Sequence, residues 1–141
     1  MSFSAKTEYA CLAMLELALH YSSGDPVCLR NLAEVHQIPS QFLVQILLQL
    51  KRSGLVHSTR GTHGGYRLAK DPDEISMLSI VDAVEGERTR LGQGRVDRSV
   101  IGRVLADVWQ SVDDAQRQLL TETTLGQLML RSQSVDAMYY I

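Results

Sequence analysis

Residues 38–69 read Ile-Pro-Ser-Gln-Phe-Leu-Val-Gln-Ile-Leu-Leu-Gln-Leu-Lys-Arg-Ser-Gly-Leu-Val-His-Ser-Thr-Arg-Gly-Thr-His-Gly-Gly-Tyr-Arg-Leu-Ala, and this stretch decides the fold. A helix is expected to start at Pro39 and Ser40, because proline has its φ already set and serine can accept a bond from a free N–H group. The following apolar residues have the spacing of one helix face: Phe42, Leu43, Ile46, Leu47 and Leu50. Gly54 can adopt the left-handed conformation that ends a helix.

A two-stranded ribbon with a glycine-rich tip is expected after this helix. Residues 55–59 and 66–69 can pair as strands. Between them lies Arg60-Gly61-Thr62-His63-Gly64-Gly65, which needs the conformational freedom of glycine to turn.

The charges of this region point to a class of function. No Asp or Glu occurs from Val35 to Lys70, so that segment carries +5 while the whole chain carries −2. Its cations are Lys51, Arg52, Arg60, Arg67 and Lys70. A few cations on a surface are usually only solvated, but a basic helix and hairpin together favour contact with a phosphate backbone.

The chain before this stretch predicts two further helices. The first is capped by Ser4 and runs to about His20 or Tyr21. Its expected core face consists of Tyr9, Leu12, Ala13, Leu17 and Ala18. Val27 and Cys28 can form a short strand beside the ribbon. The second helix is marked by Leu29, Leu32, Ala33 and Val35, and residues 36–39 form a tight turn into the next helix. This spacing predicts a helix-turn-helix, whose second helix enters the major groove.

The chain after this stretch predicts a short helix, a loop and two more helices. Ser76 or Ser79 caps the short helix, which buries Ile80, Val81 and Val84 and stops at Gly86. Residues 87–96 are polar and read as a loop. Thr124 and Gln127 have the form of a capping box, so a last short helix begins there. Residues 133–141 are expected to be a tail.

The helix expected from Asp97 to about Thr121 is predicted to hold two chains together. Its apolar residues recur at intervals of 4, 3, 4, 3 and 4, which is the spacing of a coiled-coil seam. The seam consists of Ile101, Leu105, Val108, Val112, Ala115 and Leu119. Val104, Trp109 and Leu120 widen the apolar surface, and this flank is expected to face the parent domain. Packing within one monomer is the alternative.

The candidate DNA contacts come from three elements. On the helix face opposite the core, glutamine can bond adenine, and valine or leucine can touch a thymine methyl group. That face carries Ser40, Gln41, Val44, Gln45 and Arg52, with Leu48 among them. At the tip of the ribbon, Arg60, Thr62 and His63 can reach the adjacent minor groove. Lys6 and Thr7, in the first turn of the first helix, can meet a phosphate.

Several motifs resemble the Rrf2 family of bacterial winged helix-turn-helix regulators. They are Gly54-Leu55-Val56, Arg60-Gly61, Gly64-Gly65-Tyr66-Arg67-Leu68, the opening Lys6-Thr7-Glu8-Tyr9-Ala10, Ala13-Met14-Leu15-Glu16-Leu17-Ala18, Ala83-Val84-Glu85-Gly86 and Thr124-Leu125-Gly126-Gln127-Leu128. The likeness covers nearly the whole chain. It implies that Arg60 works in the minor groove.

Many members of this family hold an iron–sulfur cluster with three cysteines in the loop before the dimer helix. Residues 87–96 contain no cysteine, and clusters are normally held by thiolates, so no cofactor and no metal are expected. Glu8 and His36 match positions that supply other ligands in unusual members. Without loop thiolates they are expected to be a capping carboxylate and a surface histidine. Cys11 and Cys28 are expected to be buried small hydrophobes.

Among cluster-free members the chain most resembles the CymR-type regulators of cysteine and sulfur metabolism. The resemblance rests on the cysteine-free loop and on the ending Met138-Tyr139-Tyr140-Ile141. It implies an association with cysteine synthase, whose active site accepts partner C-termini that end in isoleucine. Tyr139, Tyr140 and Ile141 would form that contact; packing against the chain's own core or against the dimer partner is equally open.

The expected protein is mainly α with a small β-wing. Residues 1–86 form a winged helix-turn-helix domain, 87–96 a loop, 97–132 the long dimerisation helix with a short C-terminal helix, and 133–141 a tail. At 141 residues, with no apolar run of membrane-spanning length and no signal peptide, a cytoplasmic protein is expected.

No catalytic motif is present. The expected function is a homodimeric repressor of cysteine or sulfur genes on an imperfect palindrome of double-stranded DNA. The alternatives are an Rrf2 regulator sensing redox state or a small molecule, and an interaction module that does not bind DNA.

Overall fold

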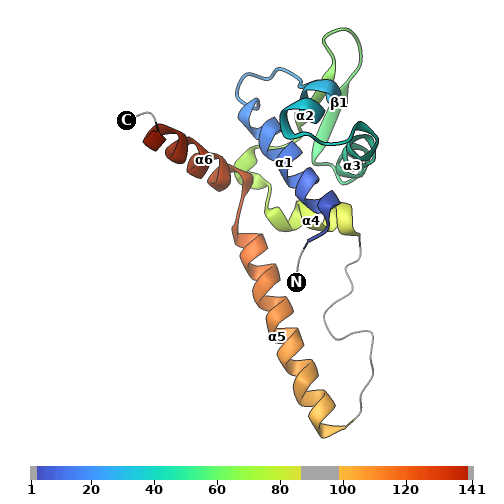
Figure 1. The fold of residues 1–141 in the computed structure, drawn as a ribbon, viewed down its shortest axis with the longest axis vertical. Helices are drawn as coiled ribbons and strands as arrows, with labels where there is room; N and C mark the ends of the chain where they lie inside the picture. The colour runs from blue at the N-terminus through green and yellow to red at the C-terminus, as the bar shows by residue number, and fades with distance from the viewer. Residues whose placement is uncertain (1–2, 87–98, 140–141) are drawn as a thin grey trace.

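The computed structural model describes residues 3–86 and 99–139. Its elements are α1 Ala5–Leu19, α2 Leu29–His36, α3 Ser40–Arg52, β1 Val56–Thr59, β2 Gly65–Leu68, the short 3₁₀ helix η1 Pro72–Glu74, α4 Met77–Glu85, α5 Val100–Glu122 and α6 Leu125–Tyr139. Helices α1 to α4 and the ribbon form one body, while α5 extends away from it as an arm and α6 returns beside α1 (Figure 1). The predicted loop at 87–96 lies outside the described residues.

The core of the body is formed around α1. Fully buried side chains from α1 and α3 meet there, among them Met14 and Leu47. Ser4 caps α1 as predicted, because its side chain accepts a bond from Thr7 N at 3.2 Å. Ser76 caps α4 in the same way, accepting from Ser79 N.

Three residues predicted to lie in the core are exposed: Leu12, Val35 and Phe42. Phe42 and Leu43 are neighbours on α3, and consecutive residues of an α-helix point about 100° apart. Leu43 takes the buried direction, so Phe42 is left at the side of the helix. On α2 the buried face is centred between Leu32 and Ala33, and Val35 points about 110° away from that centre, so it is exposed.

Helices α2 and α3 form a helix-turn-helix. Gln37 takes a left-handed conformation with φ 52°, and Ile38 N donates to Ala33 O at 2.9 Å across the turn. The predicted cap by Ser40 is wrong. Pro39 occupies the N-cap position without a side-chain bond, and Ser40 is already the first helical residue. Beyond α3, Gly54 has φ 77°, which is the left-handed residue predicted to end that helix.

Strands β1 and β2 form the predicted antiparallel wing, with Val56 opposite Leu68 and Thr59 opposite Gly65. The strand expected at Val27 and Cys28 is only a single bridge, between Val27 and Tyr66. A Cβ on Gly65 would lie 2.5 Å from Val27 O, so this close approach requires glycine. The prediction of a mainly α fold with a small β-wing is confirmed.

The corner between α5 and α6 is fastened to the body by backbone bonds. Met77 N donates to Thr123 O at 2.8 Å, and Leu125 N donates to Ile75 O at 3.0 Å. The predicted capping box is present, because Thr124 and Gln127 each accept a bond from the other's backbone N–H group.

Helix α6 is longer than the sequence indicated. It continues to Tyr139, through residues expected to be a tail. No glycine or proline occurs between Gln127 and Tyr139, so nothing in that segment interrupts the helix. Among the described residues, no helix is long and apolar enough to cross a membrane.

Candidate nucleic-acid interface

The outward face of α3 presents four uncharged side chains. They are Gln41, Val44, Gln45 and Leu48, at positions i, i+3, i+4 and i+7, and all are exposed. Val44 is 49% exposed and Leu48 is 45% exposed, whereas the core-facing residues of the same helix are fully buried. Residues with this spacing lie next to one another on one side of a helix. We call these four residues the reading face.

Cations border the reading face. Lys51 and Arg52 lie in the last turn of α3, and both are exposed. Lys51 Nζ donates to Ser58 Oγ at 2.7 Å, which joins the end of α3 to β1. The partner is a neutral hydroxyl, so the ammonium charge is not neutralised by this bond. Arg67 lies on β2 and Lys70 follows two residues after that strand, and both are exposed.

The tip of the wing lies beyond the end of β1. Arg60, Thr62 and His63 are all exposed there. Gly64 N donates to Gly61 O at 3.0 Å, which closes the turn between the strands. The wing projects from the body next to α3, so the tip and the reading face are carried by neighbouring elements (Figure 1).

Thr7 does not fit its predicted role at a phosphate. Its side chain is only 2% exposed, and its hydroxyl donates to the Glu85 carboxylate while its N–H group donates to Ser4. Both polar groups of Thr7 are therefore already used inside the protein, where they join α1 to the end of α4. Lys6 is half-buried beside it.

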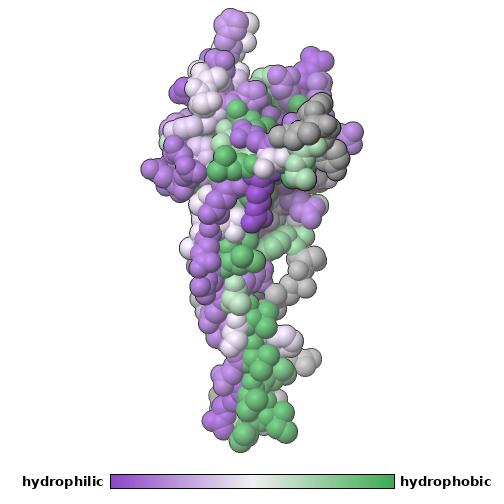
Figure 2. Space-filling view, turned by 90° about the vertical axis from the view of Figure 1, so that its left-hand side faces the viewer, coloured by the Kyte–Doolittle hydropathy of each residue, from purple (hydrophilic) through white to green (hydrophobic). Residues whose placement is uncertain are grey.

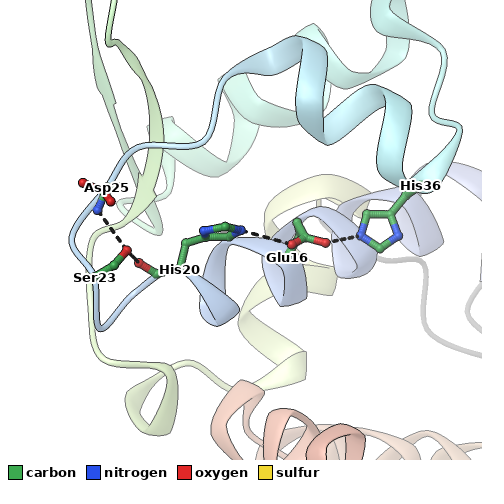
Figure 3. A network of polar contacts seen from close by, with 5 residues as sticks. All are labelled: Glu16, His20, Ser23, Asp25 and His36. Atoms are coloured by element: carbon green, nitrogen blue, oxygen red, sulfur yellow. Dashed lines mark hydrogen bonds and ion pairs between the residues drawn. The ribbon is translucent and has the colours of Figure 1, made fainter. Parts of the chain in front are cut away.

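A polar network that the sequence did not predict links α1 to the helix-turn-helix. Glu16 lies between two histidines, 3.1 Å from His36 Nε2 and 3.3 Å from His20 Nε2 (Figure 3). After His20, the turn is held by Ser23, whose hydroxyl donates to His20 O and accepts from Asp25 N. His36 is the last residue of α2, so this contact positions the turn that leads to α3.

His36 is thus half-buried and paired, not the surface histidine that was expected. The i, i+4 spacing of Glu16 and His20 is a signal that the sequence did contain. The contribution of His36 comes from another helix and has no local signal.

A hollow of about 310 Å³ lies between α1, α4 and α5. Glu8 and Cys11 line it together with Leu12, Val81 and Leu120. The side-chain cap of α1 is supplied by Ser4 and not by the Glu8 carboxylate that was expected. The lining is mostly apolar.

The donor set of this chain does not fit a cluster held by thiolates. Its only cysteines are Cys11 on α1 and Cys28 at the N-cap of α2, and both are half-buried, not buried as was expected. Burial, and then the nearby charge of Glu8, raise the pKa of Cys11 from 9.0 to about 11, so the thiol stays protonated near neutral pH. In the part of the chain that the structure describes, no group of three His, Cys, Asp or Glu side chains is placed to hold a metal ion.

The seam on α5 is uncovered in the single chain. Ile101 is 82% exposed and Val108 is 50% exposed. A band of hydrophobic side chains runs along one side of the protruding arm (Figure 2). The other seam residues are Leu105, Ala115 and Leu119, which are exposed, and Val112, which is half-buried.

The prediction that the flank of α5 faces its own domain is wrong for two of three residues. Val104 and Trp109 are exposed, because the first half of α5 projects beyond the body. Only Leu120, near the end of the helix, reaches the hollow beside α1 and α4. An ion pair joins the second half of α5 to α4, with 3.5 Å between Arg117 Nη2 and Asp82 Oδ2.

Comparison with known proteins gives consistent matches along the chain. The Rrf2 family model, described as an iron-dependent transcriptional regulator, matches residues 3–131. The chain is 40% identical over 129 residues to Rv1287 of Mycobacterium tuberculosis, whose name describes an HTH-type transcriptional regulator, with 89% of this chain and 80% of that protein covered. It is 35% identical over 138 residues to the HTH-type transcriptional regulator IscR of Vibrio vulnificus, with coverage of 96% and 82%.

Two solved structures have the same fold along nearly their whole length. IscR of T. potens matches with a TM-score of 0.81 and 30% identity, covering 96% of this chain and 90% of that one. CymR, the global cysteine regulator of B. subtilis, matches with a TM-score of 0.81 and 28% identity, covering 93% and 98%.

Proposed function

Because the chain belongs to the Rrf2 family of DNA-binding transcriptional regulators, we propose that it binds an imperfect palindrome as a homodimer and represses genes of cysteine or sulfur metabolism. The family consists of transcriptional regulators, not enzymes. The observation that carries the proposal is the reading face of α3, exposed and uncharged, with cations at its end and on the wing.

In this proposal α3 enters the major groove and the wing follows the backbone to the adjacent minor groove. Gln41 and Gln45 would bond adenine through their amides, and Ser40 and Arg52 would contact the strand at either end of the helix. Arg60, Thr62 and His63 would lie at the minor groove, where a narrow groove attracts arginine.

The dimer would form through α5 in an antiparallel arrangement. The intervals of the seam read the same from both ends, with residue 110 at the centre. Two antiparallel copies would therefore set Ile101 opposite Leu119, Leu105 opposite Ala115, and Val108 opposite Val112. Such a self-complementary surface is what a two-fold interface requires. Pairing would cover side chains that the single chain leaves in water, and a two-fold dimer matches a palindromic site.

The assignment to cysteine metabolism rests on two supports. CymR of B. subtilis, a global cysteine regulator, has the same fold over nearly all of this chain. IscR of T. potens matches the fold equally well, but the donor set here does not fit a thiolate-held cluster. The residues of this chain therefore fit a regulator without an iron–sulfur cluster better than a regulator that holds one.

One experiment tests the core of the proposal. Random-sequence DNA is selected on the purified protein, and the bound fragments are sequenced. A two-fold symmetric site should emerge, and Gln41→Ala or Gln45→Ala should cost ~1–3 kcal/mol on it and relax the base preference at one position in each half. If no sequence is enriched, or if both variants bind the site like the wild type, this placement of α3 is wrong.

The absence of a cluster needs its own measurement. Protein purified without oxygen should be colourless and should contain no stoichiometric iron. Visible absorption that disappears in Glu8→Ala or His36→Ala would overturn the cluster-free part of the proposal while leaving DNA binding intact.

The cysteine synthase contact is proposed on the resemblance of the C-terminus. Met138, close to the end of α6, is 76% exposed, so this part of the helix does not fold back into the core of the body. Tyr140 and Ile141 lie outside the described residues. A terminal carboxylate can be captured by backbone N–H groups while isoleucine fills a small apolar pocket. Deleting Ile141 should abolish binding to the synthase and leave DNA binding unchanged, and O-acetylserine should compete with the intact C-terminus.

A further inference from the structure

Two of the four side chains on the reading face are apolar, and among residues 3–86 and 99–139 nothing covers them. Val44 and Leu48 are one helical turn apart, and each is about half exposed. A single exposed apolar side chain is ordinary on a protein surface. Here the pair is contiguous, and it lies opposite the fully buried face of the second helix of a helix-turn-helix.

The reading face also lacks the side chains that read G·C pairs. Guanine is usually bonded by arginine or lysine, and cytosine by aspartate or glutamate. The sequence of α3 from Ser40 to Leu50 contains none of these, and the first cation is Lys51. What remains in the middle of the helix is glutamine, which suits adenine, and aliphatic groups, which suit the 5-methyl group of thymine.

We propose that Val44 and Leu48 read the 5-methyl groups of two thymines in each half-site, so that the bases under the middle of α3 are A·T pairs. The inference rests on the proposed function, because it requires α3 to lie in the major groove. Residues at i and i+4 are about 5–6 Å apart at Cβ, and successive bases of a strand are about 3.4 Å apart along the axis. The two methyl groups are therefore expected within about two base steps of each other.

The test removes one methyl group at a time from the DNA. Each thymine in the half-site recovered by selection is replaced in turn by deoxyuridine, which pairs identically but lacks the 5-methyl group. Affinity should fall about fourfold at each of two neighbouring positions and should be unchanged elsewhere, since about 0.8 kcal/mol accompanies the burial of one methyl-sized group. Affinity should also fall when cytosine paired with guanine replaces one of these thymines. 5-Methylcytosine at the same position should restore part of that affinity, because it carries the methyl group.

Protein variants assign each methyl group to a side chain. In Val44→Ala, uracil at one of the two positions should no longer reduce affinity; in Leu48→Ala, uracil at the other should be silent, as a double-mutant cycle requires for a direct contact. Leu130→Ala is the matched control, because Leu130 is also an exposed leucine and lies on α6, away from α3. It should keep the full response to uracil at both positions. Thermal unfolding checks that every variant folds.

The outcomes separate this inference from the proposed function. If selection yields no site, both are wrong. If a site is bound tightly but every uracil substitution is silent, or if the response to uracil persists in both alanine variants, the methyl-reading inference is wrong while DNA binding stands.

Discussion

Arg60→Ala should weaken operator binding in a way that depends on salt. Arg60 is exposed at the tip of the wing, and a dimer carries two such tips. Each phosphate neutralised by a cation contributes about 0.9 to the slope of log affinity against log salt. If Arg60 contacts phosphate, the variant dimer should therefore lose about 1.8 from that slope.

The salt slope expected for the wild-type dimer follows from the cations of the basic stretch, residues 35–70. The five cations of that stretch, all exposed, give a dimer a slope near −9 if all ten contact phosphate. Raising the salt from about 50 to 200 mM is a fourfold change, so a difference of 1.8 in slope should narrow the gap between wild type and variant by about twelvefold.

The assay is fluorescence anisotropy of the selected operator at four or more salt concentrations. Arg131→Ala is the matched control, since Arg131 is an exposed arginine on α6, outside the basic stretch. It should leave both affinity and slope unchanged. A weaker Arg60→Ala complex with an unchanged slope, and a loss that grows with A·T content, would indicate shape reading in the minor groove. Unchanged affinity and unchanged slope would refute the placement of the wing.

Three further changes test other parts of the structure. Val108→Asp should put an unpaired charge into the seam, so sedimentation should show monomers and operator binding should fall with dimerisation, whereas Gln110→Asp, at an exposed position on the opposite side of the same helix, should remain dimeric. Thr7→Val should cost about 0.5–1.5 kcal/mol in the free energy of unfolding, because it removes one of the two hydroxyl donors to the Glu85 carboxylate and leaves that of Ser4, while Thr62→Val at the wing tip should leave stability unchanged in thermal unfolding. Because the folded state raises the pKa of Cys11 from 9.0 to about 11, alkylation of Cys11 at pH 8 should be slow in the folded protein and fast after unfolding, by mass spectrometry, and the contribution of this thiol to stability should be lost as the pH rises from 9 to 11.

The order and type of the elements could be predicted from the sequence because their signals are local. Ser4 and Ser76 occur where a helix needs a cap, and Gly54 occurs where a helix ends in the left-handed region. The seam of α5 was also visible, since its spacing lies within one helix. Each of these features depends on residues that are only a few positions apart.

The features that the sequence could not show depend on contacts between elements. Thr7 has the residue type and the place of a phosphate contact, but the end of α4 supplies a carboxylate that takes its hydroxyl. Phe42 has helical spacing, but the direction of the core is set by α1 and α4 together. Glu16 and His36 are twenty residues apart and meet only because α2 packs across α1.

The backbone bonds at the corner between α5 and α6 have a consequence for the DNA. Met77 and Leu125 join that corner to the body on both sides of the chain, so the arm leaves the body without a free joint. If the α5 helices of two chains pair, the fold then fixes the distance and the rotation between the two α3 helices. One base pair inserted at the centre of the operator would turn one half-site by about 34° against the other, and no joint at this corner could absorb that rotation. Such a regulator would discriminate operators by the spacing of their two half-sites as well as by their sequence.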